Sequence, residues 1–251
     1  MIKIEIFIYV SVKFNVSLMN SLFITGSDTD VGKTYVTAGL AILLKHMGKD
    51  VGVMKPFSAG TPDKKYFQTN DVKIISKAAS VTDSVDLINP QFFPIPASPF
   101  TAWKNLKNKP NISLVLKSYK TLCNTHEFVL VEGIGGIMTP ILKNYFVIDL
   151  IKSMNSSAII VCSNKIGSIN HTLMTINMCH KYKIPLKGII INNFHKDGYD
   201  PKELCRDLSQ LSEVPIIGNI PYIKKLVDSK FVYEIFKKSI NSKFLKTILN
   251  S

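Results

Sequence analysis

Short apolar runs alternate with longer amphipathic segments along most of the chain. The runs that predict strands are residues 22–25, 51–54, 128–131, 158–162, 188–191 and 216–217. Between the first two runs, residues 34–46 carry apolar side chains at helical spacing, and Gly48 follows as a helix stop. Strands that alternate with helices predict an α/β fold with a mostly parallel central sheet and helices on both faces.

Two stretches depart from this alternation. Residues 59–69 and 89–99 are rich in turn formers and proline, so we expect irregular insertions there. With 251 residues and 46% hydrophobic side chains, the chain is long enough for one sizeable core. We therefore expect residues 19–251 to form a single domain.

The first 18 residues need a separate interpretation. Residues 4–12 are mostly apolar, but Glu5 interrupts the run, Lys13 follows it and no small-residue cleavage site appears, which argues against a signal peptide. The run also falls short of the roughly 20 apolar residues of a membrane-spanning helix. Because Met19 directly precedes the first strand, we expect residues 1–18 to be an N-terminal extension: a disordered tail, the product of an upstream start codon, or a loosely attached edge strand.

The net charge of +13 would ordinarily indicate an anionic macromolecular partner. Here Arg206 is the only arginine, the lysines are scattered, and Asn and Ile are abundant, a composition typical of a nucleotide bias toward A and T. The four cysteines form no C-x-x-C pair, which gives no support to a zinc or redox site and fits reduced thiols. We therefore expect a cytoplasmic protein whose partners include neither nucleic acid nor membrane.

The strongest local signal is the segment G-S-D-T-D-V-G-K-T at residues 26–34, between an apolar strand and an amphipathic helix. Five residues separate Gly26 from Gly32, one more than the general phosphate-loop pattern has, so Ser27 occupies the usual first-glycine position. Backbone N–H groups of such a loop bind nucleotide phosphates, its lysine reaches the terminal phosphates and its hydroxyl meets Mg²⁺. The segment predicts a P-loop NTPase-like fold and a nucleotide site formed by Asp30, Val31, Gly32, Lys33 and Thr34.

Three charged residues outside this loop are further candidates. Glu132 follows the apolar strand 128–131, and the carboxyl ends of strands line the ligand crevice of open α/β sheets. Its carboxylate is a candidate ligand because Mg²⁺ prefers hard oxygen atoms. By themselves, Asp71 is typical of an N-cap for a helix that begins near Val72, and Lys55 of a solvated lysine at a strand end.

Several spaced blocks resemble the dethiobiotin synthase family, in the family's order. The loop at 26–34 is similar to the family's G-T-D-T-x-V-G-K-T and departs from it only at Ser27. The further blocks are K-P-F-S-A-G at 55–60, N-D at 70–71, N-P at 89–90 with P-A-S-P at 96–99, V-E-G-I-G-G at 131–136, G-S-I-N-H-T-L at 167–173, and residues 188–192 and 218–221. The resemblance covers about residues 19 to 222, and its specificity comes from the number of blocks.

The resemblance implies a particular reaction. An amine of 7,8-diaminononanoate captures CO₂ as a carbamate, and a carbamate oxygen attacks the γ-phosphate of ATP, which gives ADP and a mixed carbamic-phosphoric anhydride. The second amine attacks the carbonyl, phosphate leaves, and the ureido ring of dethiobiotin closes. Because anionic groups converge in this reaction, the site needs cations and oriented donors more than a strong general base.

The resemblance also implies which residues carry the charge. Lys33 is the ligand of the γ-phosphate, and Lys55 neutralises the carbamate and the transferring phosphoryl group, so both are candidate catalytic residues. Thr34, Asp71 and Glu132 are the candidate ligands of the Mg²⁺ cofactor.

Further residues are assigned to the two organic substrates. The amide of Asn192 is expected to read adenine, since it can both donate and accept a hydrogen bond. Thr29 and Ser58 are expected to contact the diamine; Ser58 is adjacent to Ala59, which replaces the family's hydroxyl residue. The start of the helix that begins with Gly167, Ser168, Ile169 and Asn170 is expected to bind the substrate carboxylate across a homodimer interface. The alternative is that Ser168 only caps this helix.

Three alternatives remain at this point. A partition or septum-positioning ATPase would carry a signature lysine near the start of the loop, where this chain has Ser27 and Asp28. A cobyrinate-type amide ligase normally carries a glutaminase domain, for which we expect no room after Tyr222. The third alternative is an inactive homologue of the family, and the only feature that indicates it is Ala59, in place of the family's hydroxyl residue.

Overall fold

The computed structural model describes residues 20–60, 70–193, 195–223 and 228–249. The expectations for residues 1–18 and for most of the first insertion therefore lie outside the described residues, and the single-domain assignment remains a prediction. No helix within the described ranges is long and apolar enough to cross a membrane.

A six-stranded sheet forms the centre of the molecule. Its strands are β1 (Ser21–Gly26), β2 (Val51–Met54), β5 (Phe128–Gly136), β8 (Ser157–Ser163), β9 (Leu186–Asn192) and β10 (Ile216–Ile220). Their order is β10-β9-β8-β1-β5-β2, and every pairing is parallel. All six predicted strands are therefore confirmed, and β1 lies between β8 and β5.

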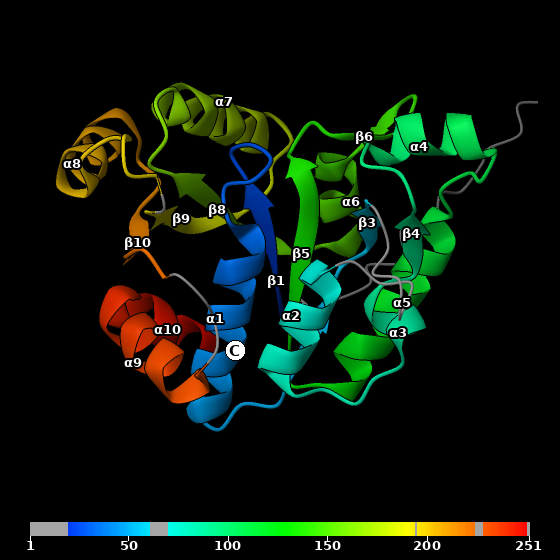
Figure 1. Cartoon of the computed structure of the whole chain (residues 1–251), viewed down its shortest axis with the longest axis horizontal. Helices are drawn as coiled ribbons and strands as arrows, with labels where there is room; N and C mark the ends of the chain where they lie inside the picture. The colour runs from blue at the N-terminus through cyan, green and yellow to red at the C-terminus, as the bar shows by residue number, and fades with distance from the viewer. Residues whose placement is uncertain (1–19, 61–69, 194, 224–227, 250–251) are drawn as a thin grey trace, which may run out of the picture.

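Helices cover both faces of this sheet, as predicted (Figure 1). Successive side chains of β1 point to opposite faces of the sheet, so Leu22 and Ile24 pack into one apolar cluster while Phe23 packs into another. The first face carries α1 (Lys33–His46), α2 (Asn70–Ala79), α9 (Ser229–Ser239) and α10 (Ser242–Leu249). The second carries α5 (Ile112–Thr125), α6 (Val147–Met154), α7 (Ser168–Lys181) and α8 (Pro201–Leu211).

Short elements lie just before the first predicted insertion, in the second one and after β5. β3 (Phe57–Ala59) pairs in parallel with β4 (Gln91–Phe93), and β6 (Pro140–Leu142) pairs with β7 (Tyr145–Phe146). The helices α3 (Val85–Ile88) and α4 (Pro99–Leu106) flank β4. The second insertion is therefore not wholly irregular; its strand is three residues long, too short to show an alternating pattern.

The C-terminal segment belongs to the core. Phe236 of α9 lies against Gly39 of α1 so closely that any side chain at position 39 would overlap its ring. Val232 and Phe236 are one helical turn apart and both are buried. This packing holds α9 beside α1, the helix that follows the phosphate loop.

Candidate nucleotide and metal site

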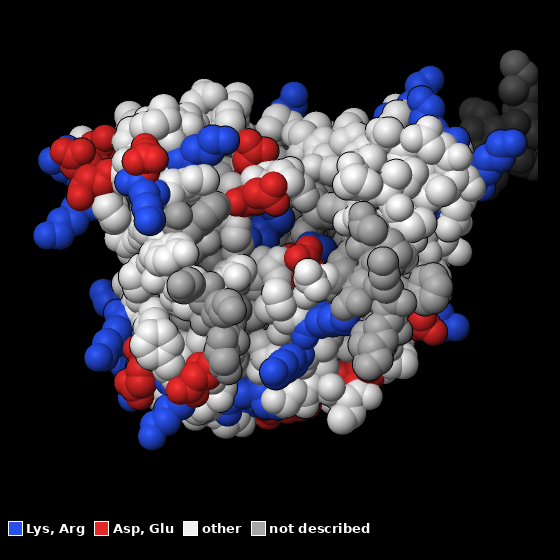
Figure 2. Space-filling model, viewed as in Figure 1, with Lys and Arg blue, Asp and Glu red and all other residues white. Residues whose placement is uncertain are grey.

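A cavity of about 870 Å³ opens at the carboxyl ends of the central strands. Figure 2 shows it as a hollow in the middle of one face, with lysine at its bottom and acidic side chains beside it. Its walls include the phosphate loop after β1, Lys55 after β2 and Glu132 on β5. A parallel sheet brings these ends together because its neighbouring strands run in the same direction.

The phosphate loop leads directly into α1. Gly32 has φ 88° and is the N-cap of α1, and no side chain caps the helix there. The first N–H groups of α1 are thus not occupied by a side-chain cap, which suits a phosphate group. Lys33 is buried beside them and its Nζ donates to the Asp28 carbonyl at 2.9 Å. Burial, followed by the positive charge of Lys55, lowers the pKa of Lys33 to about 8.

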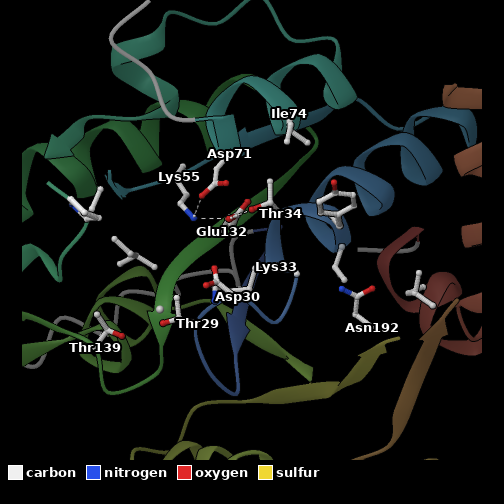
Figure 3. A pocket seen from close by; sticks show the side chains of 18 of the residues that line it. Thr29, Asp30, Lys33, Thr34, Lys55, Asp71, Ile74, Glu132, Thr139 and Asn192 are labelled. Carbon is white, nitrogen blue, oxygen red and sulfur yellow. Dashed lines mark hydrogen bonds and ion pairs between the residues drawn. The ribbon is translucent and has the colours of Figure 1, made fainter. Parts of the chain in front are cut away.

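Four of the predicted residues meet at one point of the cavity (Figure 3). Lys55 Nζ lies 2.5 Å from Glu132 Oε1 and 3.3 Å from Asp71 Oδ2, and it also donates to the Gly133 carbonyl at 3.1 Å. Thr34 Oγ1 donates to the same Glu132 oxygen at 2.8 Å. The solvated interpretation of Lys55 is therefore wrong, since Lys55 is 3% exposed and holds two carboxylates.

The charge on Lys55 follows from this geometry. Burial by itself would lower the pKa of its ammonium group, but the Glu132 and Asp71 carboxylates outweigh burial and raise that pKa above its ordinary value. The N-cap interpretation of Asp71 is also wrong, because α2 begins at Asn70 and Asp71 lies within its first turn.

The oxygen atoms of Thr34, Asp71 and Glu132 fit a magnesium ion. Glu132 is fully buried, and its Oε2 has no hydrogen-bond partner among the residues that the structure describes. No group of three His, Cys, Asp or Glu side chains able to hold a metal occurs in the described part of the chain. Mg²⁺ does not need one, because it is typically bound by one or two carboxylates together with water and substrate phosphates.

Lys55 is anchored through its backbone. Asn89 Nδ2 donates to the Lys55 carbonyl at 2.6 Å, and Ser58 Oγ donates to Asn89 Oδ1 at 2.7 Å. Ser58 is fully buried and does not line the cavity, whereas Ala59 does. The structure thus gives the Ser58 hydroxyl a neighbour other than a substrate, and the position that lacks the family's hydroxyl is the one that faces the cavity.

Asn192 lies on the other side of the phosphate loop from Lys55 (Figure 3). Its Nδ2 donates to the carbonyl of Val31 at 3.1 Å. The Val31 side chain is buried in the core, whereas Gly32 lines the cavity. Nearby apolar walls were not predicted from the sequence; they are formed by Tyr35, Ile220, Tyr222, Ile223 and Phe236. Two sequence patterns cover part of these walls: the family block at 218–221 and the helical spacing of apolar residues in α9. Neither pattern indicates a cavity by itself.

The helix start at Gly167–Asn170 does not line this cavity within one chain. Gly167, with φ 93°, is the N-cap of α7 and no side chain caps the helix. Ser168 lies inside the helix and is buried, so its predicted alternative role as the cap is wrong. His171, in the same turn, pairs through Nδ1 with Asp28 Oδ2 at 3.3 Å, which connects α7 to the phosphate loop.

A strand, a glycine-containing loop, a buried lysine and a hydroxyl paired with a carboxylate on a central strand together define a P-loop nucleotide-binding protein. A family model described as an AAA domain matches residues 20–230. Two solved structures share the fold: a ParA family ATPase from Chlorobium tepidum TLS (TM-score 0.51, 16% identity, 92% of this chain and 98% of that one) and the MinC:MinD cell division protein complex of Aquifex aeolicus (TM-score 0.50, 20% identity, 86% of each chain). At these identities the likeness shows the fold alone.

Curated relatives identify the family within that class. The ATP-dependent dethiobiotin synthetase BioD of Nitrosopumilus maritimus (strain SCM1) is 59% identical over 90% of this chain and 99% of its own length. The protein of the same name from Bacillus velezensis (strain DSM 23117 / BGSC 10A6 / LMG 26770 / FZB42) is 35% identical over 89% of this chain and 95% of its own length. The chain belongs to the ATP-dependent dethiobiotin synthetase family, a family of ligases, and the resemblance seen in its motifs is confirmed.

Proposed function

We propose that this protein uses ATP and CO₂ to convert 7,8-diaminononanoate to dethiobiotin, with release of ADP and phosphate, in the cytoplasm. The observation that carries the proposal is the convergence of Lys33, Thr34, Lys55, Asp71 and Glu132 on one cavity. Such a site offers two cations and a hydrated metal position to anionic groups, which is what carbamate phosphorylation requires.

The phosphate loop binds the triphosphate in this proposal. Backbone N–H groups from Asp30 to Gly32 and the start of α1 hold the phosphates, and Lys33 exchanges the Asp28 carbonyl for the γ-phosphate. Asn192 Nδ2 lies 3.1 Å from Val31 O, and Asn192 lines the cavity together with apolar side chains against which a base could pack. This arrangement supports the role of Asn192 in reading adenine.

Lys55 compensates the charge of the carbamate and of the phosphoryl group that moves to it. Its anchored backbone and its place in the cavity support this role. Mg²⁺, held by Thr34, Asp71 and Glu132, would supply charge compensation on the phosphate oxygens. Thr29 lines the cavity beside the loop and is our candidate for a further contact to the diamine.

We infer that the functional unit is a homodimer. The helix start from Gly167 to Asn170 lies outside the cavity of its own chain, and the lack of a side-chain cap leaves its N–H groups suited to a carboxylate. A second copy of the chain could bring this turn to the open side of the cavity. The proposed substrate carboxylate would then be bound by a residue set from both chains.

A direct assay tests the proposed reaction. Purified protein is incubated with 7,8-diaminononanoate, bicarbonate, Mg²⁺ and ATP, and dethiobiotin and ADP are quantified by mass spectrometry. We expect equal amounts of both products, and ADP only when the diamine is present. ADP formation without the diamine, with no dethiobiotin in its presence, would favour a partition-type ATPase and overturn the proposal.

A further inference from the structure

Lys55 stands among the oxygen atoms assigned to the metal ion. Glu132 Oε1 accepts hydrogen bonds from both Lys55 Nζ and Thr34 Oγ1, and Asp71 Oδ2 completes the set at 3.3 Å from the same ammonium group (Figure 3). These three side chains are the candidate ligands of Mg²⁺. The ammonium group and a metal ion thus compete for the same negative charge.

The charges of the cavity make joint occupation unfavourable. Lys33 and Lys55 both line the cavity and both are buried, so two ammonium groups already lie in one poorly hydrated region. A divalent cation on Glu132 and Asp71 would add two further positive charges next to Lys55. It would also take up the negative charge of the Glu132 and Asp71 carboxylates, which are the ion-pair partners of Lys55.

The backbone of Lys55 is anchored by two hydrogen bonds, and the residue lines the cavity. The Lys55 N–H donates to the Ile88 carbonyl at 2.7 Å, and its carbonyl accepts from Asn89 Nδ2 at 2.6 Å. Beyond this anchor, the ammonium group ends a flexible four-carbon stem. The stem lines a cavity of about 870 Å³, so it can turn from the carboxylates toward a ligand in the same cavity.

We propose that Lys55 is a movable counter-ion, which holds the Glu132 and Asp71 carboxylates until a divalent cation replaces it and then turns to the carbamate and the transferring phosphoryl group. Binding of the metal ion and repositioning of the Lys55 ammonium group are then two parts of the same exchange on the Glu132 and Asp71 carboxylates. This inference rests on the proposed function for the assignment of the metal ligands. Its alternative is that the metal uses Glu132 Oε2, which has no described partner, while Lys55 stays on Oε1.

Divalent cation binding without turnover tests the exchange. Free Mn²⁺ is measured by electron paramagnetic resonance during titration of the nucleotide-free protein, for the wild type, Lys55→Met and Lys33→Met. Lys33→Met is the matched control, since it removes a positive charge from the same cavity but Lys33 Nζ is bonded to Asp28 O. We expect Lys55→Met to bind Mn²⁺ about tenfold more tightly than the wild type, the factor that corresponds to one charged hydrogen bond, and more tightly than Lys33→Met. Equal tightening in both variants, or none in Lys55→Met, would overturn the proposal.

A second measurement covers the case in which Lys55→Met does not fold. The side-chain ammonium signals of ¹⁵N-lysine-labelled wild-type protein are recorded by NMR while Mg²⁺ is added, and the Lys55 signal is assigned by its loss in Lys55→Arg. We expect that signal to shift or broaden as Mg²⁺ saturates the site. A Lys55 signal unchanged at saturating Mg²⁺ contradicts the exchange and leaves the dethiobiotin assay, which is independent of it, to decide the proposed function.

Discussion

Gly32 of the phosphate loop lies directly beneath the side-chain amide of Asn192, and a methyl group at position 32 would overlap the amide nitrogen. Asn192 also donates to the neighbouring carbonyl of Val31. The end of β9 therefore fixes the shape of a loop that follows β1, although 161 residues separate the two bonded groups.

This contact predicts different effects of alanine at two glycines. Gly32 and Gly48 have nearly the same φ, 88° and 87°, but nothing lies within 4 Å of a methyl group at position 48. Both substitutions should lower the free energy of unfolding by about 1 kcal/mol from backbone strain. Only Gly32→Ala should also weaken ATP binding, by more than about tenfold. Denaturation curves and calorimetric titration with a non-hydrolysable ATP analogue check this, and equal ATP affinity in both variants would contradict the role of the contact.

Lys33→Ala should strongly lower turnover without unfolding the protein. The ammonium group of Lys33 compensates charge in the proposed phosphoryl transfer, and loss of one such group typically lowers kcat by about 10² to 10³. Lys104→Ala, which removes an exposed lysine of α4, is the control and should retain full activity. The check is dethiobiotin formation together with circular dichroism. A folded Lys33→Ala protein with near-normal turnover would refute the assigned loop.

The lowered pKa of Lys33 predicts a pH dependence. With a pKa of about 8, Lys33 is charged below pH 8 and loses its proton as the pH rises above it. The kcat/KM for ATP, which reports on the free enzyme, should therefore fall above about pH 8 by about tenfold per pH unit. In Lys33→Arg the guanidinium stays charged, so whatever activity remains should not fall in this range. An identical decline in both proteins would assign it to another group.

The proposed shared site predicts complementation between two impaired variants. Lys33→Ala and Asn170→Ala alter different parts of the site, and a mixed dimer would contain one site with both residues intact. Asn170→Ala alone should raise the KM of the diamine more than that of ATP, because the helix start is expected to bind the substrate carboxylate.

The measurement is dethiobiotin formation after the two tagged variants are co-expressed and the mixed species is purified. We expect activity above that of either variant by itself. Mixed dimers that form but show no such gain would refute the shared site. Failure to isolate any dimer would refute the homodimer itself.

The sequence predicts the parts of this structure that depend on local patterns. Apolar runs identified all six strands of the central sheet, and the phosphate loop was visible because its residues are contiguous. The three-residue strand β4 was not predictable, because it is too short to show a period. Ser58 was assigned to the substrate from its position next to Ala59, but the direction of a side chain depends on packing that adjacency does not specify.

Contacts between distant residues explain the other differences. Lys55 resembled a solvated lysine because its carboxylate partners lie far away in sequence, 77 residues away at Glu132 and 16 residues away (71 − 55) at Asp71. The packing of Phe236 was not predicted from the sequence, because the glycine that accommodates it lies on α1. In each case the partner, and not the residue itself, carries the information.

The same long separations have a consequence for biosynthesis of the chain. Thr34 reaches Glu132 across 98 residues and Asn192 reaches Val31 across 161, so the cavity cannot form from any continuous early segment. Pairings this far apart in sequence form slowly, because the entropy of closing the intervening chain opposes them. A polypeptide still being translated would therefore have no complete nucleotide site until β9 had left the ribosome. Affinity for ATP would then mark the moment at which the central sheet closes.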